Sequence, residues 1–228
     1  MTLSGQAEGA PMKTLEECEQ FLDRVGLATV LPGKQALFPC LLWQAQGHQG
    51  PFSGADVAFH NIWTWKDELP ARRLAFAGRL LGDQVLLVHA RLLPALLGYR
   101  GQLDVAELYA DGELSRDAFR LWETLQKAPS PVGRKELRLA LGLTDKRGAA
   151  HFDRACRDLE RLLLITRAGS AALASGWDSN AYVLLERHFD KIEPVPHESS
   201  KALVRGALLE AAPQASSLHL QRWMARLG

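Results

Sequence analysis

Three helix-compatible segments followed by two strand-compatible segments constrain the fold of this chain more than any other feature of its sequence. The spacing of apolar residues predicts helices over residues 115–127, 133–141 and 145–162. Ser115 is a suitable N-cap for the first helix, and Gly142 is a suitable C-cap for the second. A short second helix, a tight turn and a longer basic third helix are typical of helix-turn-helix proteins, whose third helix enters the major groove of DNA.

The sequence after the third helix predicts a β-hairpin. Residues 163–169 and 181–189 are apolar and rich in β-forming residues, and the segment between them is too polar to continue either strand. A hairpin in this place corresponds to a wing, so the sequence predicts a winged helix-turn-helix module over residues 113–190. Arg167 and residues near Trp177 would then approach the phosphate backbone of DNA.

The third helix has one apolar face and one charged face, and Thr144 is its N-cap candidate. The chain carries a net charge of only +1, but residues 134–167 contain nine Lys or Arg against five acidic residues. Basic charge is therefore concentrated where the motif places a DNA-facing helix. We expect DNA contacts from Arg147, His151, Arg154 and Arg161 at the groove, from Arg134, Lys135 and Arg167 at phosphates, and from Lys146 beside them.

Two alternatives remain open for this module. Asp153 with Arg157, and Arg154 with Asp158, have the spacing of ion pairs that simply stabilise a solvated helix. Winged-helix folds also serve in protein–protein contacts, so the pattern specifies the fold better than the function.

The rest of the chain is predicted to be mainly helical. Residues 1–12 are expected to form a disordered leader, and residues 13–112 a helical region with a β-hairpin, which we also consider as a degenerate winged helix. Thr14 and Glu17 form a capping-box pattern, Gly82 and Asp83 permit a tight hairpin turn, and no internal repeat is visible. Residues 191–228 predict a linker and two amphipathic helices that dock on the body. The expected class is mainly α with small β-hairpins, α+β, as tandem winged helix-turn-helix modules.

Composition and motifs exclude several classes of protein. The three cysteines, Cys18, Cys40 and Cys156, lie far apart and have no ligand spacing, which argues against disulfides and zinc and favours a reducing cytoplasm. No apolar run approaches the roughly 20 residues that span a bilayer, so no membrane association is expected. The chain lacks nucleotide-binding and serine-hydrolase motifs, and no metal or cofactor is expected.

One further stretch, together with the predicted helix-turn-helix, carries a resemblance to a known family. Residues 62–96, IWTWKDELPARRLAFAGRLLGDQVLLVHARLLPAL, together with the predicted helix-turn-helix, resemble winged-helix proteins related to the AlkZ and YcaQ crosslink-repair DNA glycosylases. The resemblance covers roughly residues 37–190. It implies tandem winged helices, duplex DNA as partner and metal-independent hydrolysis of the N-glycosidic bond of alkylated or crosslinked purines.

The family's glycosylases carry a catalytic Gln-x-Gln or Gln-x-Asp that positions the attacking water, and Gln44-Ala45-Gln46 has this spelling. The two side chains could hold one water between them if the local backbone is not a straight helix. The chain is shorter than such glycosylases, however, and its WTWKDELP segment resembles the non-catalytic relatives. We therefore expect a DNA-binding protein of repair, with a glycosylase using Gln44 and Gln46, a transcriptional regulator or a protein-interaction module as alternatives.

Two other groups of side chains are candidates for chemistry. Asp67 and Glu68 are adjacent and diverge on a helix, which favours surface or capping roles over paired catalysis. Four aromatic residues could stack on an extruded base, but their helix-compatible spacing favours the core. They are Trp43, Phe59, Trp63 and Trp65.

Overall fold

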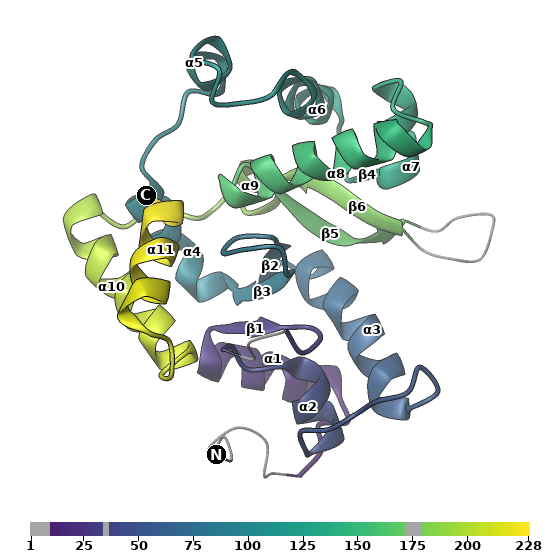
Figure 1. The fold of residues 1–228 in the computed structure, drawn as a ribbon, viewed down its shortest axis with the longest axis vertical. Helices are drawn as coiled ribbons and strands as arrows, with labels where there is room; N and C mark the ends of the chain where they lie inside the picture. The colour runs from purple at the N-terminus through teal and green to yellow at the C-terminus, as the bar shows by residue number, and fades with distance from the viewer. Residues whose placement is uncertain (1–9, 34–36, 172–178) are drawn as a thin grey trace.

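The computed structural model describes residues 10–33, 37–171 and 179–228 and shows a mixed α+β chain. Within these residues, two three-stranded antiparallel sheets are surrounded by helices (Figure 1). The expected α+β class is confirmed. In the described part of the chain, no helix is both long and apolar enough to cross a membrane.

Each sheet belongs to one set of elements, which we call the first module and the second module. The first module comprises α1 (Leu15–Val25), β1 (Leu27–Thr29), α2 (Leu41–Gln46), α3 (Val57–Ala71), β2 (Ala75–Gly78) and β3 (Leu86–His89). The second module comprises α6 (Arg116–Lys127), β4 (Val132–Gly133), α7 (Arg134–Ala140), α8 (Lys146–Arg161), β5 (Ile165–Ala171) and β6 (Ser179–Leu184). The strand orders are β1-β3-β2 and β4-β6-β5. In each module, the second strand in sequence order therefore lies at an edge of the sheet and the third lies in its middle.

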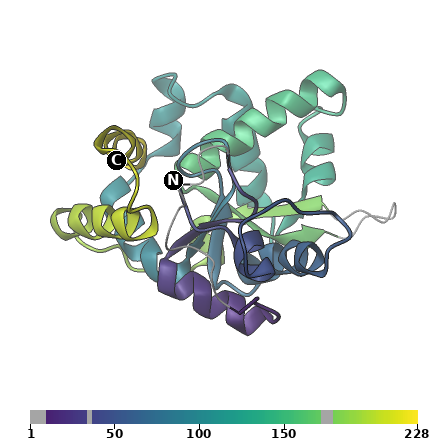
Figure 2. The same cartoon turned by 60° about the horizontal axis from the view of Figure 1, so that its bottom comes forward.

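Connecting elements link and flank the modules. The described connections are η1 (Ala90–Leu92), α4 (Leu93–Arg100), α5 (Val105–Ala110), α9 (Leu185–His188), α10 (His197–Ala211) and α11 (Ser217–Leu227). Figures 1 and 2 both show α10 and α11 together at one side of the molecule.

The backbone repeats between the modules in detail. Two residues after the third helix of each module, the backbone has a positive φ, 63° at Arg73 after α3 and 54° at Leu163 after α8. The next residue then donates its N–H to a carbonyl five residues back, Leu74 to Leu69 and Leu164 to Leu159, both at 3.0 Å. These matched helix ends align the modules with a constant offset, although no repeat is visible in the sequence.

Side chains of the first module's sheet alternate between its two faces, and both faces are covered because both sets of side chains pack into a core. Ala28, Ala77 and Leu87 face the core formed with α1, α2 and α3. Their neighbours Leu27, Phe76 and Val88 face a second core that includes residues of α4, α10 and α11. The docking of the C-terminal helices on the body is thus confirmed, and a third core fills the second module.

Buried polar contacts join the modules. Thr166 Oγ1 of β5 accepts the N–H of Ala77 of β2 at 3.1 Å, and Glu160 Oε2 of α8 accepts the N–H of Arg79 at 3.0 Å. Gly169 lies where a Cβ atom would stand 3.1 Å from the Cβ of Ala71, so α3 and β5 approach closely. The two modules therefore pack as one body.

The structure confirms some expected local features and corrects others. The capping box of Thr14 and Glu17 is present. The hairpin around Gly82 is also present, but its connection spans residues 79–85 and is not a tight turn, because Leu80 and Leu81 are drawn into the core. Met12, the last residue of the expected leader, is buried, and its N–H donates to the carbonyl of Gln44 at 3.1 Å.

Candidate nucleic-acid interface

The turn between α7 and α8 is held tightly by local contacts. The N-cap of α8 is Asp145 and not Thr144, since Asp145 Oδ1 accepts the N–H of Gly148 at 2.6 Å. A Cβ atom on Gly148 would lie 2.7 Å from the backbone of Leu143, so only glycine permits this approach. Arg138 of α7 donates to the carbonyl oxygens of Leu143, Thr144 and Asp145. Sequence reasoning did not assign this bracing role to Arg138, which fixes the start of α8.

The faces of α8 are those that the sequence predicts. Phe152, Cys156 and Leu159 are fully buried in the core of the second module. Arg147, Arg154 and Arg161 are exposed and recur every seven residues, which places them along one stripe of the helix. We call these three residues the arginine stripe. Among the described residues, none of the three has an ion-pair partner.

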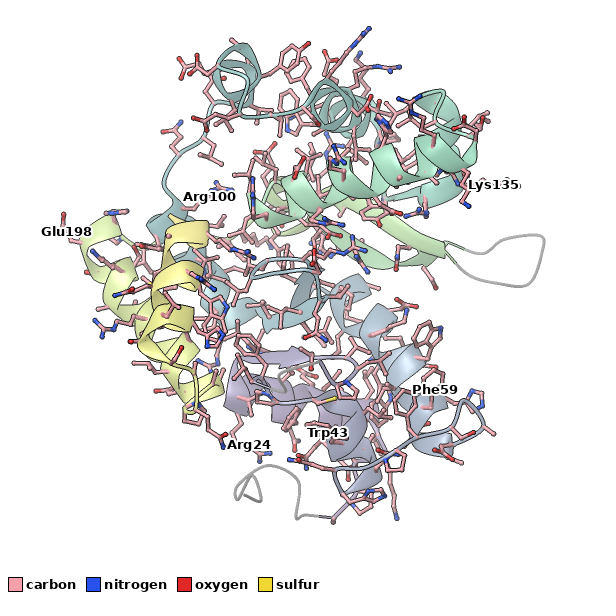
Figure 3. The ribbon with its side chains drawn as sticks, viewed as in Figure 1. Arg24, Trp43, Phe59, Arg100, Lys135 and Glu198 are labelled. Atoms are coloured by element: carbon pink, nitrogen blue, oxygen red, sulfur yellow. The ribbon has the colours of Figure 1, made fainter. Side chains whose placement is uncertain are left out.

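His151 is exposed beside the arginine stripe. Its Nδ1 lies 3.0 Å from Oδ2 of Asp117 on α6. Lys146 is exposed at the start of α8, and Lys135 is exposed on α7, at the end of the second module far from α10 and α11 in Figure 3. The structure thus brings six of the eight expected DNA-contacting residues to the exposed surface of α7 and α8.

The surroundings of Arg134 do not fit the expected phosphate contact. Its guanidinium makes a two-pronged ion pair with Asp153 and lies over the ring of Phe152, 5.1 Å from the ring centre. The hydrogen bond from Arg134 holds the pKa of the Asp153 carboxyl below its usual range, although partial burial opposes the shift. The same hydrogen bond raises the pKa of Arg134. Arg134 is therefore engaged within the module.

Arg167 does not fit a phosphate contact either, because it is buried between the modules. Its Nε donates to Oε1 of Glu160 at 2.9 Å, and the two side chains are 12% and 0% exposed. Burial by itself lowers the pKa of Arg167, but the Glu160 carboxylate outweighs it and the net shift of the pKa is upward. We remove Arg167 from the candidate set. Trp177, the other residue expected near phosphate, lies outside the described residues.

The ion pairs along α8 that the alternative interpretation requires do not form among the described residues. Asp153 pairs with Arg134, and Arg157 lies 3.5 Å from Asp83 in the first module. No ion pair between Arg154 and Asp158 is found in the described part of the chain. The stripe is consequently not a solvated face stabilised by its own acidic neighbours.

Gln44 and Gln46 lie on α2, a regular helix that ends at Gly47 in the left-handed conformation. Residues two apart on an α-helix point roughly 200° apart around its axis. The condition for holding one water between the two side chains is therefore not met. Gln46 Nε2 donates to the Pro51 carbonyl at 3.5 Å, while its Oε1 is buried without a hydrogen-bond partner among the described residues.

Asp67 and Glu68 have separate basic partners. Asp67 lies 2.8 Å from the amino group of Lys66, and Glu68 lies 2.7 Å from the guanidinium of Arg72. These contacts agree with the surface roles expected for both carboxylates. Among the described residues, no three His, Cys, Asp or Glu side chains form a group that could hold a metal ion.

The aromatic residues of α3 divide between core and surface. Trp65 is 5% exposed and belongs to the core, as expected, whereas Trp63 is 46% exposed. Phe59 stacks between Phe52 and Trp63, with ring centres 5.7 Å and 5.4 Å away. Sequence reasoning named Phe59 and Trp63 but missed Phe52. The spacing of Phe59 and Trp63 on one helix was the signal that could have indicated an aromatic surface there.

The structure is thus a two-module α+β protein in which one helix, α8, presents an exposed arginine stripe. Its sequence matches the family model described as AlkZ related over residues 12–225, and the chain belongs to this family.

Two further comparisons complete this picture. Among solved structures, the chain is similar to Streptomyces sahachiroi DNA glycosylase AlkZ, with 14% identity and a TM-score of 0.47. The similarity covers 97% of this chain and 62% of that chain, so the protein spans less than two thirds of that structure. No curated protein matches the sequence.

Proposed function

We propose that this protein binds duplex DNA in a DNA-repair process, and that α8 makes the principal contacts. The arginine stripe carries the proposal. Its three arginines lie on one exposed helical face and have no acidic ion-pair partner among the described residues. Such a face suits the phosphates and base edges of a DNA groove.

The order of elements supports the same function. In the second module, three helices are followed by the β5–β6 hairpin, with the short β4 between the first two helices. This is the order of a winged helix, in which the third helix enters the major groove and the hairpin lies beside it. The first module has the same order, so we propose a tandem winged-helix architecture for the chain.

Membership of the AlkZ-related family supports a role in repair, because the sequence resembles relatives of the AlkZ and YcaQ crosslink-repair DNA glycosylases. Our proposal for this chain is limited to DNA binding, since α2 does not bring Gln44 and Gln46 together.

The arginine stripe can be tested by fluorescence anisotropy with a short labelled duplex. Replacing Arg147, Arg154 and Arg161 together by alanine should weaken binding at least about tenfold. The slope of log affinity against log salt should fall by about two to three, because each lost phosphate contact removes about 0.9. A matched variant replaces three exposed basic residues of α10 and α11, Lys201, Arg205 and Arg222, by alanine.

The control variant removes the same charge from another surface, so it should keep wild-type affinity and salt dependence. Equal losses in both variants would mean that binding depends on overall charge and not on α8. A role in repair adds a second expectation, because the protein should then prefer alkylated or branched duplex over intact duplex of the same sequence. Equal binding of all three would argue for a different role.

A further inference from the structure

The third helices of the two modules carry different surfaces at equivalent positions. The matched helix ends align Leu69 with Leu159, which places Val57 and Thr64 of α3 where α8 has Arg147 and Arg154. Both α3 residues are exposed and uncharged. The first module therefore lacks a basic stripe suited to duplex phosphates. If α3 contacts DNA, it must do so through a part of the DNA other than the duplex phosphates.

The exposed feature at α3 is a row of parallel aromatic rings, two from α3 and one from the segment before it. Phe52, Phe59 and Trp63 stack with interplanar angles of 10° and 16°. Phe52 is 42% exposed, and no other ring stacks on it among the described residues. We call these three residues the aromatic stack. Its outer end offers a free aromatic face to solvent, which is unusual for rings that serve only the core.

A basic group closes the other end of the stack. The amino group of Lys66 lies over the Trp63 ring, 4.5 Å from the ring centre, and also contacts Asp67. A cation beside stacked rings is the arrangement with which proteins hold a base and the phosphate attached to it.

Trp63 and Lys66 also line a pocket between the modules with a volume of about 520 Å³. The second module contributes Arg134 and Asn180 to its wall, and the β2–β3 connection contributes Gln84. The volume falls in the range of small-molecule sites, about 300–1,000 Å³. The amide groups of Asn180 and Gln84 can each donate and accept hydrogen bonds, as the edge of a nucleobase requires.

We propose that the aromatic stack and this pocket bind unpaired nucleotides of DNA. A base stacks on the free face of Phe52, behind which Phe59 and Trp63 are stacked, Lys66 contacts a phosphate, and the next base enters the pocket that Trp63 lines, toward Asn180. The proposal extends the proposed function, because the pocket wall continues from α3 to Arg134, which begins α7 of the DNA-binding module. Duplex held by α8 and an unpaired segment held by α3 would be neighbouring parts of one ligand.

The test compares three fluorescent probes by anisotropy: a paired duplex, the same duplex with a bulge of unpaired thymidines, and a short oligothymidylate. The variants are Trp63→Leu, which keeps an apolar side chain but removes the ring, and Trp63→Phe, which restores a ring. Tyr109→Leu is the matched control, since Tyr109 is an exposed ring stacked on Phe119 away from the pocket.

The wild-type protein should bind the bulged duplex more tightly than the paired duplex. Trp63→Leu should lose at least about fivefold in affinity for oligothymidylate and should lose the preference for the bulge. Trp63→Phe and Tyr109→Leu should retain both. Loss of affinity for the paired duplex is not expected in any of these variants.

The outcomes separate this inference from the proposed function. Equal binding of bulged and paired duplex, or an oligothymidylate affinity that Trp63→Leu leaves unchanged, overturns the inference while duplex binding by α8 stands. Oligothymidylate binding that depends on Trp63, without any binding of paired duplex, supports the inference and overturns the proposed function. Binding of none of the three probes overturns both.

Discussion

Glu160 joins the two modules through its buried carboxylate. Its fully buried carboxylate accepts hydrogen bonds from the backbone N–H of Arg79 and from the side chain of Arg167. A buried charge is costly unless it is paired, so removing either Glu160 or Arg167 leaves the other as an unpaired buried charge. Arg79 contributes a longer contact, 3.6 Å from its guanidinium to the same carboxylate.

Replacing Glu160 by glutamine should therefore destabilise the whole protein. The change keeps the shape of the side chain but leaves the buried Arg167 without a counter-charge, and we expect a loss of about 2–4 kcal/mol in the free energy of unfolding. Urea denaturation measures this loss. Glu186→Gln, on an exposed residue of α9, is the control and should change stability by less than about 0.5 kcal/mol. Similar losses in both would argue against the ion pair as the source.

Residue-scale contacts are also where sequence reasoning reached its limit. The exposed arginine stripe was predictable because helical periodicity alone separates Arg147 and Arg154 from Phe152. The burial of Arg167 was not, since it results from a contact with another module and not from the pattern of its own strand. The same holds for the pocket at Trp63, whose wall combines residues that are far apart in sequence.

At the scale of elements, helices were predictable and short strands were not. Capping residues and apolar spacing predicted α1, α6 and α8 closely, whereas β1 and β4 have only three and two residues and carry no alternating pattern. Their positions are set by pairing with β3 and β6, which are distant in sequence. The repeat between the modules is hidden for a related reason, because the matched helix ends conserve backbone geometry and not residue type.

The packing of the C-terminal segment on α4 depends on one glycine. A Cβ atom on Gly98 would lie 1.9 Å from the carbonyl oxygen of Val195, in the segment that leads into α10. The N–H of Val195 donates to the carbonyl of Pro94 at 2.9 Å, which holds this approach. Backbone cannot yield as a flexible side chain would, so the segment must move to admit a methyl group.

Gly98→Ala should accordingly lower the free energy of unfolding by about 1–3 kcal/mol. Gly206→Ala is a matched change within α10, where a Cβ atom would meet no neighbour within 4 Å. This second variant should be more stable than wild type by up to about 1 kcal/mol, because alanine favours the helix. Thermal denaturation of both variants checks the opposite signs. Stabilisation by both would show that the segment yields at little cost.

At the scale of the whole molecule, two histidines that are at least partly buried make stability depend on pH, and one of them joins α9 to α3. His188 of α9 is buried, and its Nε2 lies 2.7 Å from the carbonyl oxygen of Pro70 on α3, to which a neutral imidazole donates. Burial lowers the pKa of His188, and the nearby Arg73 lowers it further, although the hydrogen bond to Pro70 opposes the shift. Burial also lowers the pKa of His89, against the effect of the Asp23 carboxylate.

These two shifts make stability depend on pH in a known direction. A histidine whose pKa is lower in the folded protein takes up its proton first in the unfolded chain, near pH 6.5. The contribution of each histidine is therefore fully present above about pH 6.5 and is lost as the pH falls toward its folded pKa. Unfolding free energy should decline over this window by at most about 1.4 kcal/mol per pH unit for each histidine.

Replacing His188 by glutamine, which keeps an N–H donor, should flatten this decline. Urea denaturation between about pH 5.5 and 7.5 measures the slope, within a window where carboxylates remain ionised. The variant should have a smaller slope than wild type below about pH 6.5 and the same slope above it, whatever its absolute stability. The His89→Gln/His188→Gln double variant should be flatter still. An unchanged slope in the double variant would mean that the contact between Pro70 and His188 does not couple the packing of the modules to pH.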